Sequence, residues 1–303
     1  MEKYSFTDPE ILRQLHEFAS FFQKKRYAPN TMKVYCNYAG YFMEWSKTHE
    51  VEPKSTTYNH LLQFIKYSQK EGRKPRNINL VLTAIRHYFD MLQLPVNPAS
   101  GLYIRGERKT IPHDLLSAGQ LHQLYEQYQV YNERTQRNKV ITGLYVYQGI
   151  TTDELKKLTP KSINLKAGKI HIPATKQTYN KGGRKSRWLK LKANQILELQ
   201  EYLQAIRPRI NKGESPQLFV SLTGSENLKN SIKHLMEDLR KIDPQVKNGQ
   251  QIRKSVIVNW LKEKDIRQVQ YLAGHSSISS TERYKAANLE ELEEALKVHH
   301  PLK

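Results

Sequence analysis

The sequence reads QQIRKS at residues 250–255, YLAGHSSI at residues 271–278 and TERY at residues 281–284. Apolar side chains at residues 252, 256 and 257 surround Arg253, which places this arginine at the start of a helix beside a core. Tyr284 stands nine residues after His275. Taken singly, Arg253 would be a surface arginine and Tyr284 one of eighteen tyrosines. Their order and spacing make the arginine, the histidine and the tyrosine candidates for one shared site.

The charge of the chain indicates a polyanionic partner. Its 303 residues include 49 Lys and Arg against 29 Asp and Glu, a formal net charge of +20. Twelve of the basic residues lie between Lys156 and Lys192, where no acidic residue occurs. A basic run is commonly a solvated face, but the absence of acid over this whole stretch favours a binding role.

Composition excludes several classes of protein. The single cysteine, Cys36, leaves no partner for a disulfide within the chain and too few thiolates for a cysteine zinc site. No apolar run approaches the roughly 18 residues of a membrane span, and the first residues lack the apolar region of a signal peptide. The histidines show no metal-binding helical pair. We therefore expect a soluble, cytoplasmic protein without a metal site.

The first hundred residues predict an all-helical domain. Apolar positions recur there at intervals of three and four. They define four amphipathic helices, which contain Leu12 to Phe22, start at Pro29, run from about Ser55 to Gly72, and carry Ile78 to Leu92. The aromatic stripe around Phe42 and Trp45 is expected in the core rather than as a base-stacking surface. Residues 102–114 show no period, so we expect a domain over residues 1–101 and a linker over 102–114.

Residues 115–303 predict a second, mainly helical α+β domain. Helices are expected after Ser117, up to Gly149, and near residues 193–206, 225–241, 251–263, 265–273 and 288–298. Short runs at residues 162–166, 169–173 and 186–191 predict a small antiparallel sheet, with a long basic turn from Lys176 to Lys185. The tail helix at residues 288–298 either packs on its own domain or docks on a neighbouring subunit.

The C-terminal segments resemble the tyrosine recombinase, or phage integrase, family. The family signature is an arginine at the head of a helix, a Leu-Gly-His-Ser-Ser segment, and a tyrosine nine residues after that histidine. Residues 253, 271–278 and 284 follow this order. Residues 30–35, 77–79 and 97–98 are similar to the family's helical N-terminal domain, which clamps DNA. The resemblance covers nearly the whole chain and implies the same two-domain fold.

The resemblance implies that Tyr284 attacks a DNA phosphodiester, forms a 3′-phosphotyrosyl link and releases a 5′-hydroxyl, with no metal or nucleotide cofactor. Arg253 matches the second of the family's two arginines, whose guanidinium suits phosphate oxygens. His275 matches the histidine that hydrogen-bonds the phosphate. Lys176 is the candidate for the lysine that protonates the leaving oxygen, and Lys181 and Lys185 are alternatives.

Two positions depart from the family pattern. The first arginine falls on Thr151, and the histidine three residues before the second arginine falls on Gln250. Gln250 can donate a hydrogen bond but cannot transfer a proton as imidazole can. Thr151 replaces a cation with a hydroxyl, and with Glu154 it has the pattern of a capping box that starts a helix. A basic residue from elsewhere could fill the missing place. The candidates are Arg184, Arg187 and Lys254, which with Lys181 and Lys185 are also expected to bind DNA.

Three functions stay open at this point. The first is a recombinase or integrase, associated with the nucleoid, that acts on double-stranded DNA at inverted repeats as four protomers, alone or with a second recombinase. The second is a catalytically impaired accessory member of the same family that binds such DNA. The third is a general basic RNA-binding protein, which would show no preference for a DNA inverted repeat.

Overall fold

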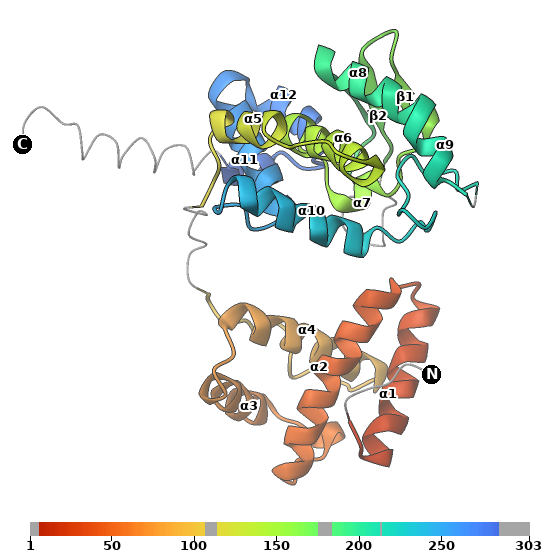
Figure 1. The fold of residues 1–303 in the computed structure, drawn as a ribbon. Coiled ribbons are helices and arrows are strands. Elements are labelled where there is room, and N and C mark those ends of the chain that lie inside the picture. The colour runs from red at the N-terminus through yellow and green to blue at the C-terminus, as the bar shows by residue number, and fades with distance from the viewer. Residues whose placement is uncertain (1–5, 107–113, 175–183, 213, 285–303) are drawn as a thin grey trace, which may run out of the picture. The chain divides into compact units, whose positions relative to one another are not determined.

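The computed structural model describes residues 6–106, 114–174, 184–212 and 214–284. The chain divides into two compact units, residues 1–109 and 110–303, which Figure 1 colours from red to blue along the chain. Within the described ranges, no helix is both long enough and apolar enough to cross a membrane.

The first unit consists of the helices α1 (Pro9–Lys24), α2 (Pro29–Thr48), α3 (Tyr58–Lys70) and α4 (Pro75–Met91), with a short 3₁₀ turn, η1 (Pro53–Ser55). These are the helices that the apolar periodicity predicts. α2 packs against both α1 and α4, and Phe42 and Trp45 are buried in the core of this unit, as expected. α3 begins three residues later than predicted, because Thr57 and His60 form a capping box at its start.

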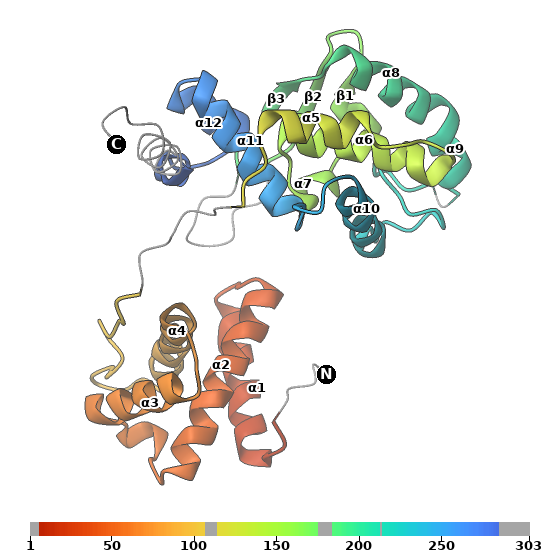
Figure 2. The same ribbon diagram turned by 60° about the vertical axis from the view of Figure 1, so that its left-hand side comes forward.

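The second unit is built around α6 (Glu133–Gln148), which packs against α5 (Ala118–Glu126), α8 (Ala193–Glu201) and α11 (Gly249–Glu263). Figure 2 shows α5 and α6 in front of the sheet, with α11 to one side. The predicted start of α5 is confirmed, since Ser117 is its N-cap. α6 ends at Gly149, which adopts the left-handed conformation with φ 55°.

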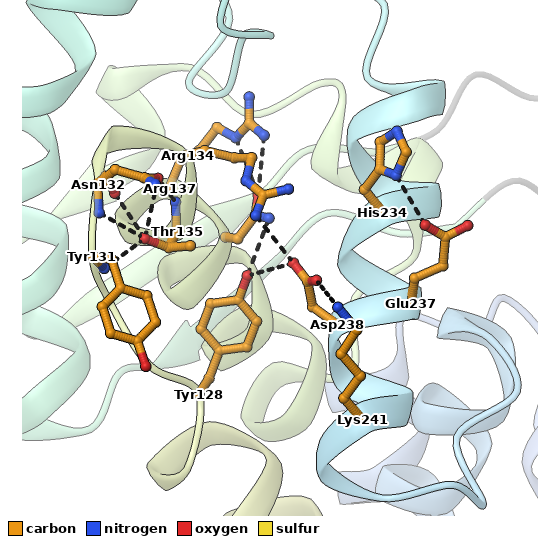
Figure 3. Close-up of polar contacts among 11 residues, drawn as sticks. Tyr128, Tyr131, Asn132, Arg134, Thr135, Arg137, His234, Glu237, Asp238 and Lys241 are labelled. Carbon is orange, nitrogen blue, oxygen red and sulfur yellow. Dashed lines mark hydrogen bonds and ion pairs between the residues drawn. The ribbon is translucent and has the colours of Figure 1, made fainter.

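Buried polar side chains on α6 are satisfied by the chain around them (Figure 3). Arg137 Nη1 donates to the carbonyl of Val220 at 2.8 Å. Asn138 Nδ2 donates to the Tyr128 hydroxyl at 3.2 Å, and that hydroxyl donates to Asp238 on α10 (Lys229–Ile242), also at 3.2 Å. These contacts fix α10 to α6, so the charged residues of this cluster have a structural role.

The strands β1 (Ile163–Asn164), β2 (Lys169–Ile172) and β3 (Arg187–Lys190) form an antiparallel sheet in the order β1-β2-β3. All of them lie within the predicted runs. Along β3 the side chains alternate, so that Arg187 and Leu189 are buried while Trp188 and Lys190 are exposed. This alternation turns Arg187 into the interior of the unit.

The remaining helices are α7 (Thr152–Leu155), α9 (Arg207–Ile210) and α12 (Ile266–Ala273). α10 begins at Lys229, later than predicted, with Leu228 as its N-cap. Just before it, the side chain of Asn227 accepts the Lys229 N–H at 3.1 Å in an Asx turn. The helical chain after α8 extends past residue 206, through a π-helical turn at Tyr202–Ile206 into α9. The predicted tail helix at residues 288–298 and most of the basic turn lie outside the described residues.

Candidate active site

Arg253 is held by the ends of two helices. It is 5% exposed, in the second turn of α11, whose N-cap is Asn248. Its Nη1 donates to the carbonyl of Gly149 and its Nη2 to the carbonyl of Ala273, both at 2.5 Å. Gly149 caps the C-terminus of α6, and Ala273 is the last residue of α12. Because helix C-termini attract cations, the guanidinium joins α6, α11 and α12 at one point.

Glu154 is the carboxylate at the centre of this cluster. It is fully buried on α7, and its Oε1 lies 2.8 Å from Nη1 of Arg187. Its Oε2 lies 3.7 Å from Nη1 of Arg253 and 3.9 Å from Nη1 of Arg184. Arg187 also donates through Nε to the carbonyl of Leu272 on α12, at 2.7 Å. One carboxylate thus pairs with three guanidinium groups, so positive charge is in excess here.

Thr151 is the N-cap of α7 and lies at the edge of the cluster. Its hydroxyl accepts the N–H of Glu154 at 3.2 Å, and Glu154 Oε2 accepts the N–H of Thr151 at 2.9 Å. The predicted capping box is therefore confirmed. The same hydroxyl accepts a hydrogen bond of 2.9 Å from Nη1 of Arg184, in the segment that leads into β3.

His275 and Tyr284 are placed by the chain that follows α12. Gly274 ends that helix with φ +67°, a left-handed conformation that favours glycine. The Nδ1 of His275 lies 2.9 Å from the hydroxyl of Thr281, which is fully buried. Residues 279–284 are helical and carry Tyr284, whose ring stacks on that of His275 with centroids 6.0 Å apart and an angle of 11° between the planes. Tyr284 also packs against the apolar residues Ile257, Val269 and Ala273.

The excess of guanidinium groups shifts the protonation of its neighbours. Burial, and then the charges of Arg253, Arg184 and Arg187, lower the pKa of His275 to about 4. Burial also lowers the pKa of Arg253 to about 10, although the charge of Glu154 opposes this. For Glu154, burial acts to raise the pKa, but the hydrogen bond and charge of Arg187 outweigh it and hold the pKa at about 2. At neutral pH the imidazole is neutral, the carboxylate ionised and the guanidinium charged.

Three of the residues singled out in the C-terminal segments come together with Thr151. Arg253 interacts electrostatically with both Tyr284 and His275, and Arg253 donates to the carbonyl of Gly149, two residues before Thr151. Gln250 is exposed in the first turn of α11.

The basic candidates for DNA contact lie in different environments. Arg184 is partly exposed and contacts Thr151, Lys185 is exposed just before β3, and Lys254 is half-buried on α11. Arg187 is different: its side chain is fully buried and faces Glu154 rather than solvent. Lys176 and Lys181 lie outside the described residues.

Two supporting residues were not identified from the sequence as part of the site. The sequence pattern assigns Glu154 only to a capping box, although it is the last acid before the basic stretch from Lys156 to Lys192, which contains none. Thr281, which contacts His275, lies three residues before Tyr284. At that spacing two helical residues share a face, so the position of Thr281 relative to the tyrosine was the available signal.

Comparisons with known proteins identify the family of the chain. Residues 115–291 match the phage integrase family, and residues 14–94 match its N-terminal SAM-like domain. The chain is 28% identical to tyrosine recombinase XerA of Pyrococcus furiosus over 298 residues, covering 93% of this chain and 92% of the relative. It is 24% identical to tyrosine recombinase XerD of Listeria innocua, covering 92% of this chain and 95% of the relative.

Solved structures share the fold. The chain is similar to the XerH site-specific recombinase bound to palindromic difH substrate, with a TM-score of 0.69 and 18% identity, covering 98% of this chain and 91% of that one. It is also similar to the Tn1549 transposon integrase in complex with transposon right end DNA, with a TM-score of 0.65 and 15% identity, covering 92% and 99%. The predicted fold class, a helical N-terminal domain followed by a mainly helical domain with a small antiparallel sheet, is confirmed.

Proposed function

The chain belongs to the phage integrase family, and from this premise we propose that it is a site-specific recombinase that cuts and rejoins duplex DNA through Tyr284. The observation that carries the proposal is that Tyr284 stacks on His275 beside a cluster in which three arginines pair with a single carboxylate. Cleavage of a phosphodiester requires a nucleophile together with positive groups for the charge on the non-bridging oxygens. The cluster contains both.

In the proposed reaction the hydroxyl of Tyr284 releases its proton to water, and its oxygen forms a bond to phosphorus while the bond from phosphorus to the 5′ oxygen breaks. The products are a 3′-phosphotyrosyl ester and a 5′-hydroxyl, which takes up a proton as it leaves. Lys176 is the proposed donor of that proton, with Lys181 and Lys185 as alternatives. Because the new ester retains the energy of the old one, attack by a 5′-hydroxyl rejoins the strand without a nucleotide cofactor.

His275 and Arg253 have complementary roles in this proposal. When the Thr281 hydroxyl donates to Nδ1, the proton of the neutral imidazole lies on Nε2 and is available to a phosphate oxygen. Arg253 uses one N–H of each Nη for the carbonyls of Gly149 and Ala273. The second N–H on each nitrogen is left for phosphate, and the amide of Gln250 is proposed as a further donor.

The test is formation of a covalent complex with DNA. A duplex that the chain selects from a random-sequence pool is nicked beside the scissile position, so that the short released strand diffuses away and the complex accumulates. We expect a DNA adduct on a denaturing gel that is lost in Tyr284→Phe and kept in Tyr131→Phe, a control at a tyrosine that is 79% exposed. No adduct from the unsubstituted chain would overturn the proposal.

A second candidate function is favoured by Thr151. Loss of one preorganised donor to a developing oxyanion lowers a rate by about 100- to 1000-fold, so the chain is alternatively an accessory member that binds DNA without cutting it. This alternative predicts binding to the selected duplex without an adduct, and a biological function that Tyr284→Phe leaves unchanged. Equal binding to an RNA competitor would instead favour a general RNA-binding protein.

The proposed assembly follows the same premise. Residues 1–101 and 115–303, linked by residues 102–114, would form a clamp around DNA, and four protomers would hold two inverted-repeat sites, alone or with a second recombinase. The segment at residues 288–298 would dock on a neighbouring subunit in this assembly or pack on its own domain. Deletion from residue 287 onward distinguishes the two, because only intersubunit docking predicts a loss of cooperative DNA binding.

A further inference from the structure

Arg184, in the segment that leads into β3, contacts Thr151, the position at which the family has an arginine. Nη1 of Arg184 donates to the Thr151 hydroxyl at 2.9 Å and lies 3.9 Å from Oε2 of Glu154. Among the described residues, neither Arg187 nor Lys254, the other two candidates from the sequence, has a hydrogen bond to Thr151. The contact separates Arg184 from the rest of the basic run.

The three arginines that pair with Glu154 differ in their access to a ligand. The side chain of Arg187 is fully buried and donates to Glu154 and to the carbonyl of Leu272. The side chain of Arg253 is 6% exposed and donates to two helix-end carbonyls. The side chain of Arg184 is 35% exposed. It therefore combines contact with the cluster and access from outside.

We propose that Arg184 is a catalytic residue that supplies the guanidinium absent at position 151 and binds a non-bridging oxygen of the scissile phosphate. This inference rests on the proposed function. The side chain of Thr151 is shorter than that of an arginine, which leaves room for the guanidinium of Arg184. Its hydroxyl accepts a hydrogen bond from Nη1 of Arg184, so Thr151 positions Arg184. A guanidinium presents its N–H groups in a planar fork that matches the oxygens of a phosphate.

The charge balance of the cluster supports this role. Glu154 is matched most closely by Arg187, at 2.8 Å, while Arg184 lies 3.9 Å from the same carboxylate. The positive charge of Arg184 also reaches the rest of the site, since it lowers the pKa of both Arg253 and His275. A phosphate beside these groups would enter a region of excess positive charge.

The test compares Arg184→Ala and Arg184→Lys with Arg209→Ala, measured as adduct formation on the nicked duplex at saturating DNA. Arg209 is a matched control, an arginine of the same unit whose side chain is 68% exposed and 3.9 Å from Glu133. We expect Arg184→Ala to slow adduct formation by about 100- to 1000-fold, Arg184→Lys to slow it less, and Arg209→Ala to leave it unchanged. Thermal unfolding checks that each variant is folded.

Two further measurements separate catalysis from a structural role. A duplex with a neutral methylphosphonate at the scissile position no longer needs charge neutralisation, so the defect of Arg184→Ala should shrink on it. Adding Thr151→Arg to the Arg184→Ala variant should raise its rate of adduct formation at least tenfold, because the substitution returns a guanidinium to the cluster. A residue that only held α7 in place would show neither effect.

The outcomes distinguish the inference from its premise. No adduct from the unsubstituted chain overturns the proposed function, and this inference with it. An adduct that forms at the same rate in Arg184→Ala overturns the inference and leaves the proposed function standing. The inference is also overturned if Arg184→Ala is slow and its defect is reduced neither by the methylphosphonate duplex nor by Thr151→Arg, because Arg184 would then be structural.

Discussion

Nη1 of Arg187 lies 2.8 Å from Oε1 of Glu154, and neither side chain is exposed. The pair joins β3 to α7, and the bond from Arg187 Nε to the carbonyl of Leu272 joins β3 to α12. Removing one partner of a buried ion pair leaves the other as an uncompensated charge. The pair is therefore the structural support beneath Thr151, and through α12 it also supports His275.

Glu154→Gln tests this support. We expect it to lower the free energy of unfolding by about 3 to 5 kcal/mol, because Arg187 would lose its counter-charge inside the protein. Urea denaturation measures the change. The control is Glu237→Gln, at a carboxylate that is 41% exposed and pairs with Lys233 and His234, where we expect a much smaller loss because solvent screens an exposed ion pair. Equal losses in the two variants would contradict a structural role for the buried pair.

Much of the fold could be predicted because the signals are local. The period of apolar residues is enough to find α1 to α4, and caps such as Ser117 and Gly149 set helix ends. The start of α10 is not predicted, because the chain before its N-cap, Leu228, forms a turn in which Asn227 accepts the Lys229 N–H. Such a local side-chain contact is not visible in a periodic pattern.

The candidate site was predictable in part. The spacing from His275 to Tyr284 identified the stacked pair, but it could not show which basic residue contacts Thr151. Arg187 and Arg184 belong to the same basic run and differ by three positions, yet one is buried and the other partly exposed. The difference depends on the strand alternation at β3 and on packing against Glu154, a contact between residues 33 positions apart.

Gly274→Ala is predicted to be more harmful than Gly72→Ala. Both glycines have a left-handed backbone, with φ +67° and +74°, so both substitutions add the strain of about 1 to 2 kcal/mol that a Cβ brings there. A Cβ on Gly72 would meet nothing within 4 Å, whereas on Gly274 it would lie 2.5 Å from Nη1 of Arg187. We expect a further loss of about 1 to 3 kcal/mol for Gly274→Ala, measured by thermal unfolding. Similar losses for both variants would show that the buried arginine moves aside freely.

DNA binding is predicted to weaken steeply with salt. If the proposed function holds, the exposed basic residues between Lys156 and Lys192 replace counterions on the DNA backbone. For about 6 to 10 phosphate contacts, affinity should fall by roughly 1,000- to 100,000-fold between 50 and 200 mM salt. Fluorescence anisotropy with the selected duplex measures this. Arg184→Ala should reduce the slope of log affinity against log salt concentration by about one phosphate contact. Arg209→Ala should not change this slope. A slope near zero would contradict a phosphate-binding surface.

His275 is predicted to stay neutral where the protein works. Its folded pKa is about 4, against an ordinary value of 6.5, so between these values the folded state binds fewer protons than the unfolded state. The stability that this imidazole contributes is therefore complete above about pH 6.5 and is lost as the pH falls towards 4. NMR titration, with the His275 signal assigned by its loss in His275→Gln, measures the folded pKa. Removing the nearby charge in Arg184→Ala should raise that pKa, while Arg209→Ala should leave it in place. A folded pKa near 6.5, or one that ignores Arg184, would contradict the charge distribution proposed for the site.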